Sequence, residues 1–571
     1  MKFGLSQYTL DHFFTRVVDT YASRPALALV GDKPMTYSEF GHRVLELKSL
    51  LRSMGIRKND KVAILGQSSP NWAIAYMAVI TLGAVAVPIL EEFPAADIEH
   101  ILRHAGVKAL FISQRHYENM TLEALTQIHT VFKMDDFSML DNQNTTTRLW
   151  RQLHELQNVI KPSEKSHTAE KEHIEEEHLA EILYTSGTTG HSKGVMLTHK
   201  NIVSNIFEGP DLLKVIHQES IILSILPMAH AFGSTSAFLS ILYCGACIYY
   251  LDKPPAPKIL LNAMQTVRPT IMGAVPLVFE KIYHKQVVPT MAKSPVLRMM
   301  AKTPFTKKVL YRIIGKKIRT LLGGRLDCVI IGGAAFSPEV ELFMQQGKIP
   351  YCCGYGMSEC APLITFSSME TKKTGSPGHA IAGVSLKIVN ADEESGVGEI
   401  YVKGPNVMQG YYKNKEATAA VFTRDGWLIT GDRGYLDKDG YLFITGRSKN
   451  VIIGPSGENI YPETIEAKLL ESIFVEETLV YKLENQLVAR IHPNYAYIES
   501  MDDKKDESVI ATDIVKILES VRREVNAKLP GFSQIARVFE QTSPFIKTPT
   551  NKIKRAEYVP GYGKDGKPSV F

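Results

Sequence analysis

This 571-residue sequence has no long apolar run free of Gly and Pro, no complete set of zinc-ligating cysteines and no strong charge of one sign. The six cysteines include no C-x-x-C pair with a second pair or a histidine pair to complete a zinc site, so they fit reduced thiols. The net charge of +5 is too small over this length to indicate a nucleic-acid partner by itself. With 44% apolar and 22% charged residues, the composition excludes a disordered or collagen-like chain and predicts several folding units.

Two stretches, 72–90 and 221–251, come nearest to a membrane span because they carry no charge apart from one histidine. The first is just long enough to cross a bilayer, but Gly83 and Pro88 interrupt it and its end alternates like a buried strand. A proline and two glycines divide the second. We therefore predict a helix then a strand in the first, and strand, loop, helix and strand in the second. The start of the chain has no apolar signal-peptide core, so we expect a cytoplasmic location.

Short apolar runs alternate with helix-length amphipathic segments through much of the chain. This alternation is typical of α/β proteins with parallel sheets, which is the fold class predicted here. From about residue 375 to 446, short strands separated by Gly and Asp turns predict a small β-rich, barrel-like subdomain. Beyond residue 450 the helical patterns return. The strand-like runs are 62–67, 108–113, 221–227, 247–251 and 328–333.

The most informative segment is YTSGTTGHSKG at 184–194, which directly follows a strand-like run. Its three glycines let backbone N–H groups turn toward an anion, while its hydroxyl groups and lysine add donors and positive charge. The pattern G-x-x-x-x-G-K-[ST] is missing, so this is not the common P-loop, and a flexible surface turn is the alternative. We predict that the loop wraps a triphosphate. The residues expected to contact ATP are Thr185, Ser186, Gly187, Thr188, Thr189, Gly190 and Lys193.

With this loop and seven later motifs in order, nearly the whole chain resembles the adenylate-forming superfamily of acyl-CoA synthetases, firefly luciferases and peptide-synthetase adenylation domains. One such motif is a weak signal, whereas eight in order are specific. The resemblance implies that a carboxylate attacks the α-phosphate of ATP, pyrophosphate leaves, and a thiol then takes the acyl group from the adenylate. The later motifs are LPMAHAFG (226–233), GGAAFSPE (332–339), YGMSE (355–359), GEIYVKG (398–404), ITGD (429–432), GRSKN (446–450) and KTPTNKIKR (547–555).

The resemblance assigns the YGMSE motif to the nucleotide. Glu359 matches a magnesium ligand, and a hard carboxylate oxygen suits that ion; Thr185 is placed beside it. Ser358 stands where the superfamily usually has Thr and would offer a catalytic hydroxyl to the α-phosphate. Tyr355 would lie against the adenine ring, and without the surrounding pattern it would read as a core aromatic beside a turn. Small residues would let the backbone approach the base; these are Gly333, Ala334, Ala335 and Gly356.

Three charged residues complete the implied ATP site. Asp432 matches the carboxylate that accepts hydrogen bonds from both ribose hydroxyls. An aspartate that only stabilises a β-turn is the alternative for this position. Arg447 would place a permanently charged guanidinium group near the ribose and the phosphates. Lys552 is the catalytic lysine expected to reach the α-phosphate, with a solvated tail or Lys554 as alternatives. Asn551 replaces the usual Gly of this motif, and Asn tolerates a positive φ better than most residues.

The same resemblance implies the domain organisation. An N-terminal adenylation domain would span 1–446 and a mobile α+β lid 451–571. Lys449 falls at the hinge position inside 447–450, where a backbone rotation exchanges one lid face for the other. One face would bring Lys552 for adenylation. The other would bring a loop toward the thiol of CoA, and its residues are Gly457, Glu458 and Asn459.

The activated acid is expected to be a fatty acid, because 269–283 resembles long-chain acyl-CoA synthetases and no aspartate stands ready for an amino group. His230 would border the acyl channel as a further catalytic candidate, or be an ordinary loop histidine. Gly233 replaces a residue that is often acidic, and small residues from 233 to 237 are expected to leave room beside the channel. The predicted pocket residues are His230, Phe232, Val275, Gly332, Gly354 and Met357.

A second lipid-related feature is the segment 281–326, which contains twelve Lys or Arg and no acidic residue. Apolar residues lie among these charges, and a basic amphipathic helix is typical of membrane surfaces. We expect this segment to make peripheral contact with the inner face of an anionic membrane. The alternative is a solvated insertion that packs on the core. Nucleic-acid binding has only this segment in its favour.

The sequence as a whole predicts an AMP-forming long-chain fatty acid–CoA ligase that uses ATP, Mg²⁺ and CoA. One alternative keeps the adenylation chemistry and passes the acyl group to an acyl carrier protein. Another is a non-catalytic nucleotide- or lipid-binding relative, which the joint presence of Lys552, Glu359 and Asp432 argues against. Chain length and oligomeric state are not readable from these motifs.

Overall fold

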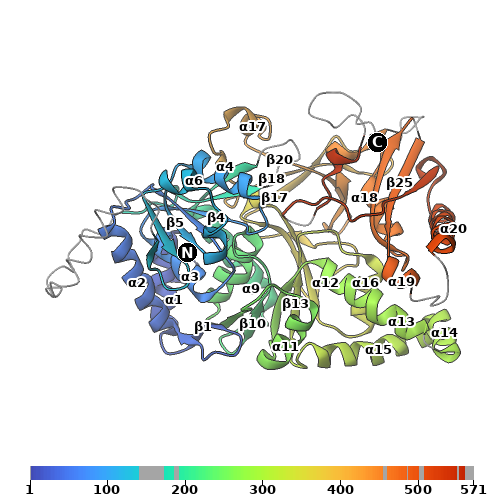
Figure 1. The fold of residues 1–571 in the computed structure, drawn as a ribbon, viewed down its shortest axis with the longest axis horizontal. Helices are drawn as coiled ribbons and strands as arrows, with labels where there is room; N and C mark the ends of the chain where they lie inside the picture. The colour runs from blue at the N-terminus through green and yellow to red at the C-terminus, as the bar shows by residue number, and fades with distance from the viewer. Residues whose placement is uncertain are drawn as a thin grey trace.

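The computed structural model describes residues 2–140, 173–185, 192–292, 294–453, 459–484, 486–499, 507–549 and 552–559. Two large, mostly parallel sheets form the bulk of the molecule, and a smaller α+β region lies beside them at the C-terminal end (Figure 1). The α/β fold class predicted from the alternating runs is confirmed.

The larger sheet has the order β16-β15-β14-β13-β12-β10-β11-β1-β2. Its central strands are parallel, and antiparallel strands close both edges. Such strands are covered on both faces, which explains their continuous apolar sequences. They are β1 (Pro25–Leu29), β2 (Met35–Thr36), β10 (Ile221–Ser224), β11 (Cys247–Tyr250), β12 (Ile271–Ala274), β13 (Cys328–Ile331), β14 (Tyr351–Gly356), β15 (Leu363–Ser367) and β16 (His379–Ala380).

The second sheet has the order β19-β9-β8-β4-β3-β5-β6-β7, with β8, β4, β3, β5 and β6 parallel. The strand β8 and its antiparallel neighbour β9 flank the glycine-rich loop as a hairpin. The strands are β3 (Lys61–Leu65), β4 (Val85–Ile89), β5 (Val107–Ile112), β6 (Thr130–Lys133), β7 (Met139–Leu140), β8 (Leu179–Thr185), β9 (Lys193–Thr198) and β19 (Gly410–Tyr411).

Helices cover both sheets, and side chains cap several of them. Thr36 and Thr198 each begin a helix with a capping box, in which the side chain and the third helical residue bond each other's backbone. The helices are α1 (Leu10–Tyr21), α2 (Tyr37–Ser53), α3 (Pro70–Thr81), α4 (Ala95–Ala105), α5 (Gln114–Tyr117), α6 (Leu122–Thr126), α8 (His199–Ile206), α9 (Glu208–Leu213), η2 (Phe232–Leu239), α10 (Ser240–Tyr243), α11 (Pro257–Val267), α12 (Pro276–Ile282), η3 (Tyr283–Val287), α13 (Val288–Ala292), α14 (Pro295–Lys302), α15 (Pro304–Leu321), α16 (Pro338–Gln346) and α17 (Lys415–Ala419).

Both uncharged stretches lie inside this layered core, as predicted. The first forms α3 and then β4, and ten of the twelve residues of α3 are buried. The second forms β10, the helices η2 and α10, and β11. Within the part of the chain that the structure describes, no helix is both long and apolar enough to span a bilayer.

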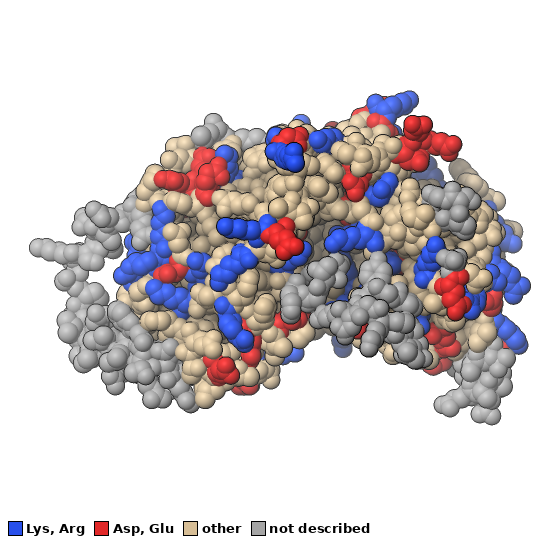
Figure 2. Space-filling model, turned by 90° about the horizontal axis from the view of Figure 1, so that it is seen from above, with Lys and Arg blue, Asp and Glu red and all other residues tan. Residues whose placement is uncertain are grey.

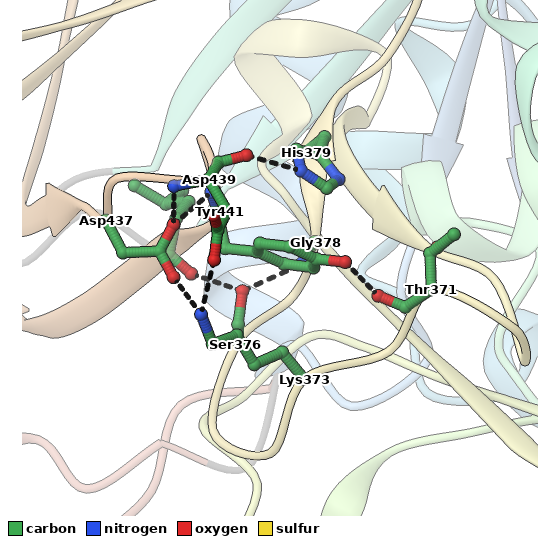
Figure 3. Close-up of polar contacts among 9 residues, drawn as sticks. Thr371, Lys373, Ser376, Gly378, His379, Asp437, Asp439 and Tyr441 are labelled. Atoms are coloured by element: carbon green, nitrogen blue, oxygen red, sulfur yellow. Dashed lines mark hydrogen bonds and ion pairs between the residues drawn. The ribbon is translucent and has the colours of Figure 1, made fainter.

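A four-stranded antiparallel sheet, β17-β18-β20-β21, follows in the region predicted to be β-rich. A polar network holds its β20–β21 turn to the preceding loop (Figure 3): Lys373 pairs with Asp437, and the Tyr441 hydroxyl donates to the Thr371 carbonyl at 2.6 Å. This sheet therefore has a fixed attachment to the larger one. Its strands are β17 (Ser385–Val389), β18 (Gly398–Lys403), β20 (Leu428–Leu436) and β21 (Leu442–Arg447).

The C-terminal region beyond residue 450 packs around apolar clusters of its own, separate from those of the large sheets. A three-stranded sheet, β24-β25-β26, lies against α18 and α20 at the right of Figure 1. The exact domain boundary and the lid's mobility stay predictions. The elements are β22 (Ile452–Ile453), β23 (Asn459–Ile460), α18 (Pro462–Leu469), β24 (Val475–Leu483), β25 (Gln486–Pro493), α19 (Tyr495–Glu499), α20 (Glu507–Asn526) and β26 (Arg537–Glu540).

Candidate active site

Three of the expected nucleotide residues meet on strands from different sheets. The Tyr355 hydroxyl on β14 donates to Asp432 Oδ2 on β20 at 2.7 Å, and Arg447 Nε on β21 lies 3.1 Å from Asp432 Oδ1. Asp432 is buried, and burial raises the pKa of Tyr355, which keeps its hydroxyl a donor. Each oxygen of the Asp432 carboxylate keeps a further lone pair. The two oxygens can therefore still accept hydrogen bonds from two neighbouring hydroxyl groups.

The turn after β14 presents the YGMSE motif toward this cluster. Gly356 is required there, because a Cβ at this position would lie 2.0 Å from the Pro362 carbonyl oxygen. Ser358 and Glu359 follow in a short 3-10 helix, and the Glu359 carbonyl accepts the Met408 N–H at 2.9 Å. The backbone thus fixes the turn from both sides, and both side chains are partly exposed.

The glycine-rich loop starts and ends close to the same place. Thr185, the last residue of β8, pairs with Lys193, the first residue of β9. The Lys193 ammonium lies over the Tyr411 ring, 5.1 Å from its centre. The residues between them that were expected to contact ATP lie outside the described residues; these are Ser186, Gly187, Thr188, Thr189 and Gly190.

Tyr411 is a site residue that the sequence analysis missed. Its hydroxyl donates to Glu359 Oε1 at 2.9 Å, while its ring supports Lys193. Burial raises the pKa of the Tyr411 hydroxyl, so it stays a donor to the carboxylate. Tyr411 and Glu359 are 52 residues apart in the chain, and no local pattern relates them. Only the pairing of β19 with β9 brings them together.

The fit of Mg²⁺ can be judged from Glu359. Tyr411 engages Oε1, which leaves Oε2 for a cation, and a carboxylate oxygen is a ligand that Mg²⁺ prefers. Among the described residues, no three His, Cys, Asp or Glu gather as a metal cage. Mg²⁺ commonly binds one or two carboxylates together with substrate phosphates. The residues present therefore fit a magnesium ion that arrives with a nucleotide.

An apolar cavity lies next to the polar cluster. It holds about 710 Å³ of empty space, part of it open to solvent. Of the predicted pocket residues, Val275 does not line the cavity. Its Cγ1 lies near Gly333, 3.7 Å from where a Cβ on that glycine would stand. Ala334 and Ala335 are exposed. The predicted residues that do line the cavity are His230, Phe232, Gly332, Gly354 and Met357.

His230 is neutral at physiological pH in this position. Burial, with a smaller contribution from the charge of Lys552, lowers the pKa of His230 to about 4. The Phe232 N–H donates to His230 Nδ1 at 3.3 Å, so the ring hydrogen is on Nε2. The ring can donate one hydrogen bond to a group in the cavity but carries no positive charge for it.

Gly233 corrects one expectation about this cavity. A Cβ at 233 would lie 1.9 Å from the Pro227 carbonyl oxygen, so the position is filled by the neighbouring backbone and does not leave room beside the channel. Ser234 and Ala237 are buried, and of the small residues from 233 to 237 only Ser236 lines the cavity. Glycine is needed at 233 because the loop that follows β10 packs tightly against the start of η2.

Lys552 reaches this site from the C-terminal region. Its charge acts on His230, and the charges of Arg447, Asp432 and Glu359 act on it in turn. The residue is exposed to solvent. Loss of solvent around the ammonium is the main effect that lowers the pKa of Lys552, Arg447 lowers it further, and both carboxylates oppose the shift.

Two ion pairs fix the turn that carries Lys552. Lys547 pairs with Glu477, and Arg555 binds Glu466 at 2.6 Å within the C-terminal region. The backbone N–H of Thr548 donates a hydrogen bond to the Lys552 carbonyl at 2.7 Å. The basic residues at either end of this motif thus anchor the turn, which leaves Lys552 free to point at the site.

The hinge and the loop expected near CoA are only partly described. Lys449 lies exposed in a short 3-10 helix, Ser448–Asn450, directly after β21. Asn459 begins β23, and Gly457 and Glu458 lie outside the described residues. The structure therefore places Lys449 between the two regions, and its hinge role stays a prediction.

Comparisons with known proteins agree with this arrangement. A model of the AMP-binding enzyme family matches residues 14–412. Fatty acyl-CoA synthetase A of Dictyostelium discoideum is 26% identical over 93% of this chain and 85% of that protein. Long chain acyl-CoA synthetase 3 of Arabidopsis thaliana is 29% identical over 93% of this chain and 86% of that protein. The o-succinylbenzoate coenzyme A synthetase of Bacillus subtilis, solved with ATP and a magnesium ion, has a TM-score of 0.70 at 22% identity, over 95% of this chain and 98% of that one.

The family match covers well over half of the chain and includes the glycine-rich loop, the cavity, Tyr355 and Glu359. Asp432, Arg447 and Lys552 lie beyond it, and the structure brings them to the matched part. The solved structure supports the fold: a large domain of α/β sheets with a small α+β region. The chain belongs to the AMP-binding enzyme family, whose members are adenylate-forming enzymes.

Proposed function

We propose that this enzyme activates a fatty acid with ATP to an acyl-adenylate and then transfers the acyl group to CoA. The observation that carries the proposal is the position of the apolar cavity directly against the polar cluster. Gly354, Tyr355 and Gly356 line the cavity, and Tyr355 and Gly356 also begin the YGMSE motif of the polar cluster. A long acyl chain in the cavity would thus end with its carboxylate beside the nucleotide.

The nucleotide-binding roles follow from the geometry of the cluster. Asp432 accepts the ribose hydroxyls while Tyr355 and Arg447 hold its two oxygens in place. Tyr355 is only partly buried and lines the cavity, so the accessible part of its ring would lie against the adenine. Lys193 and the hydroxyl of Thr185 stand at the two ends of the phosphate loop. Glu359 would hold Mg²⁺, which when bound compensates phosphate charge.

In the first half-reaction, a carboxylate oxygen of the acid forms a bond to the α-phosphorus, and the bond to pyrophosphate breaks. Negative charge builds on phosphate oxygens during this step, so donors and cations lower the barrier. Lys552 supplies a positive charge there and Ser358 a hydroxyl. His230 is neutral and would donate from Nε2 to an oxygen of the acid, which orients the carboxylate without holding it by charge.

In the second half-reaction, the thiol sulfur attacks the acyl carbonyl carbon, AMP leaves, and the thiol proton passes to solvent. We propose that rotation at Lys449 withdraws Lys552 and brings the loop around Gly457, Glu458 and Asn459 to the thiol. The separate apolar cores of the C-terminal region support its movement as a unit, because few packed side chains would have to exchange partners.

The fatty acid and CoA rest on the two named relatives and on the apolar cavity. A pyrophosphate-release assay with CoA and carboxylates from short to very long tests both. Activity is expected to rise with chain length, because each added methylene that enters the cavity contributes about 0.8 kcal/mol. If no acid releases pyrophosphate, the proposal fails. Replacing CoA with an acyl carrier protein tests the other acceptor: faster thioester formation on the carrier would replace CoA in the proposal.

A further inference from the structure

The helices α14 and α15 form the lower right edge of the molecule in Figure 1. One face of α15 packs on the core of the larger sheet through buried side chains, including Tyr311, whose ring meets that of Phe343 at 5.0 Å. The helix is therefore held firmly by one side. The residues of this buried face are Leu310, Tyr311, Ile314, Gly315 and Ile318.

The opposite face of these helices exposes large apolar side chains. Among the described residues, seventeen large hydrophobic side chains are exposed, and five of them fall between Val296 and Ile313. Phe305 is the most exposed of all seventeen, at 79%. Scattered exposed apolar residues are normal, whereas a concentration on one element needs a reason. The five are Val296, Met299, Phe305, Val309 and Ile313.

Three of these side chains form a stripe on α15. Phe305, Val309 and Ile313 are spaced by four residues, so they lie on one face of the helix, about half a turn around from the buried face. Exposed bases stand on both sides of the stripe: Lys308 and Arg312 on one side and Lys317 on the other, with Lys316 at its end.

The charge of this region has only one sign. Between Lys281 and Leu326 twelve residues are Lys or Arg and none is Asp or Glu. Where the structure describes this segment, none of its bases takes part in an ion pair. By contrast, the face seen in Figure 2 carries acidic and basic side chains side by side. The apolar stripe thus lies in a field of positive charge that no acid of its own segment compensates.

We infer that this face of α14 and α15, hereafter the basic apolar face, docks on an anionic lipid surface. Charge decides between the occupants: a second copy would bring the bases of this face against an identical set of bases, whereas an anionic leaflet attracts each base. The apolar side chains would enter the headgroup region while the flanking bases stay at phosphate level, as long basic side chains do at interfaces. This inference is independent of which acid the active site uses.

Flotation of the full-length protein with vesicles tests the inference. Vesicles of pure phosphatidylcholine are compared with vesicles containing about one third phosphatidylglycerol, at low salt and at about 0.5 M salt. The protein is expected to float with the anionic vesicles at low salt, to bind neutral ones far less, and to be released by high salt. Failure to float with anionic vesicles at low salt overturns the inference, whether or not the protein instead self-associates through this face.

A matched pair of charge reversals locates the binding face. One variant changes Lys308, Arg312, Lys316 and Lys317 to Glu. The control changes four exposed bases elsewhere, so both variants alter the net charge by the same amount. Since one base near an anionic leaflet is worth about fivefold in partitioning, the first variant is expected to lose at least ~100-fold and the control far less. Equal losses in both overturn the assignment to this face. The control residues are Lys415, Arg424, Lys438 and Lys516.

A second variant, Phe305→Ser with Ile313→Ser, tests the apolar stripe. It also tests vesicle binding by this face if the charge-reversal variant fails to fold. Both side chains point to solvent, so the helix should keep its packing on the core. Vesicle binding is expected to fall by roughly tenfold or more, because the buried apolar area is lost. Circular dichroism confirms the fold, and adenylate formation from a short soluble acid should be unchanged. Binding equal to wild type would overturn the role of the stripe.

Discussion

The two halves of the candidate active site are held in different ways. In the half carried by strands, both carboxylates have protein partners: Tyr355 donates to Asp432, and Tyr411 donates to Glu359. In the half carried by the C-terminal region, the backbone turn is anchored by Arg555, but the Lys552 ammonium has no hydrogen-bond partner among the described residues. It meets the strand-borne half only through longer-range charge.

This difference indicates a division of labour. The strand-borne residues are positioned before any substrate arrives, as suits groups that bind a nucleotide in both half-reactions. A lysine held by nothing but its own turn can leave the site without breaking a bond, which suits a group needed in one half-reaction only. The following predictions test whether the two halves really separate in this way, and the largest expected effect comes first.

Replacing Lys552 with Ala should remove the lid-borne contribution alone. Acyl-adenylate formation is expected to fall by roughly 10²–10³-fold, the scale for losing one electrostatic stabiliser of the transition state. Thioester formation from added acyl-adenylate should be largely spared. Single-turnover assays of each half-reaction measure the two rates. Equal losses in both would mean that Lys552 serves the whole cycle, and the division would be wrong.

The pH dependence of the same half-reaction sharpens this test. Because the pKa of Lys552 is lowered, the protonated lysine is lost on raising the pH before an ordinary lysine would be. Adenylation should therefore fall at an alkaline pH below the ordinary lysine value. In Lys552→Arg, whose cation does not titrate, that decline should move to higher pH or vanish.

Replacing Lys449 with Pro should hold the two halves together. Pro fixes φ near the value found in a 3-10 helix, which is the present conformation of Lys449, with Lys552 at the site. Adenylate should still form, while thioester formation is expected to fall by about 10²-fold, the scale for misplacing a reacting group. A burst of pyrophosphate without thioester measures this. Normal rates in both steps would remove Lys449 from the hinge role.

Replacing Tyr411 with Phe should weaken the strand-borne half without touching the lid. Without the hydroxyl, Glu359 loses the bond that orients its carboxylate, so the Mg²⁺ concentration for half-maximal adenylation is expected to rise about 10-fold. Tyr412→Phe is the matched control, because the one hydrogen bond of the Tyr412 hydroxyl within the described part of the chain goes to the Ala105 carbonyl, at 3.4 Å. An unchanged Mg²⁺ requirement in Tyr411→Phe, or an equal change in the control, would argue against the positioning role.

The sequence predicted the strands well where burial alone decides them. The run at 62–67 became β3 and the run at 328–333 became β13, because strands covered on both faces must be apolar throughout. The sequence could not show that these two runs enter different sheets. That depends on pairings between distant segments, such as Leu27 of β1 with Ile248 of β11.

The candidate site shows the same limit. Motifs identified Tyr355 and Asp432 separately, but the bond between them joins residues 77 positions apart. Tyr411 has no motif to mark it. Gly233 was misread as spare room, because the Pro227 carbonyl that fills its missing side chain is placed there by the tertiary fold. Local patterns thus give the residues of a site more readily than the contacts among them.

The last prediction concerns stability instead of catalysis and involves Glu181, a buried residue of β8 in the large sheets. Its Oε2 accepts a hydrogen bond from the Tyr76 hydroxyl at 3.1 Å, and Oε1 has no hydrogen-bond partner among the residues that the structure describes. Burial raises the pKa of Glu181 to about 8, against an ordinary value of 4.5. Between these two values the folded protein keeps a proton that the unfolded chain releases. Stability contributed by this group therefore falls as pH rises through that window and levels off above it.

Glu181→Gln should remove that pH dependence, because an amide is neutral throughout. The variant is expected to match wild type near pH 4.5 and to be more stable at pH 8, by about 2–4 kcal/mol if the raised pKa is expressed in full. Calorimetric melting at both pH values measures the change. Since Glu181 belongs to the large sheets, the transition of the C-terminal region, whose apolar cores are separate, should not move. Parallel pH profiles for the two proteins would mean that Glu181 is ionised in the folded state, and a shift of both transitions would mean that the two regions unfold together.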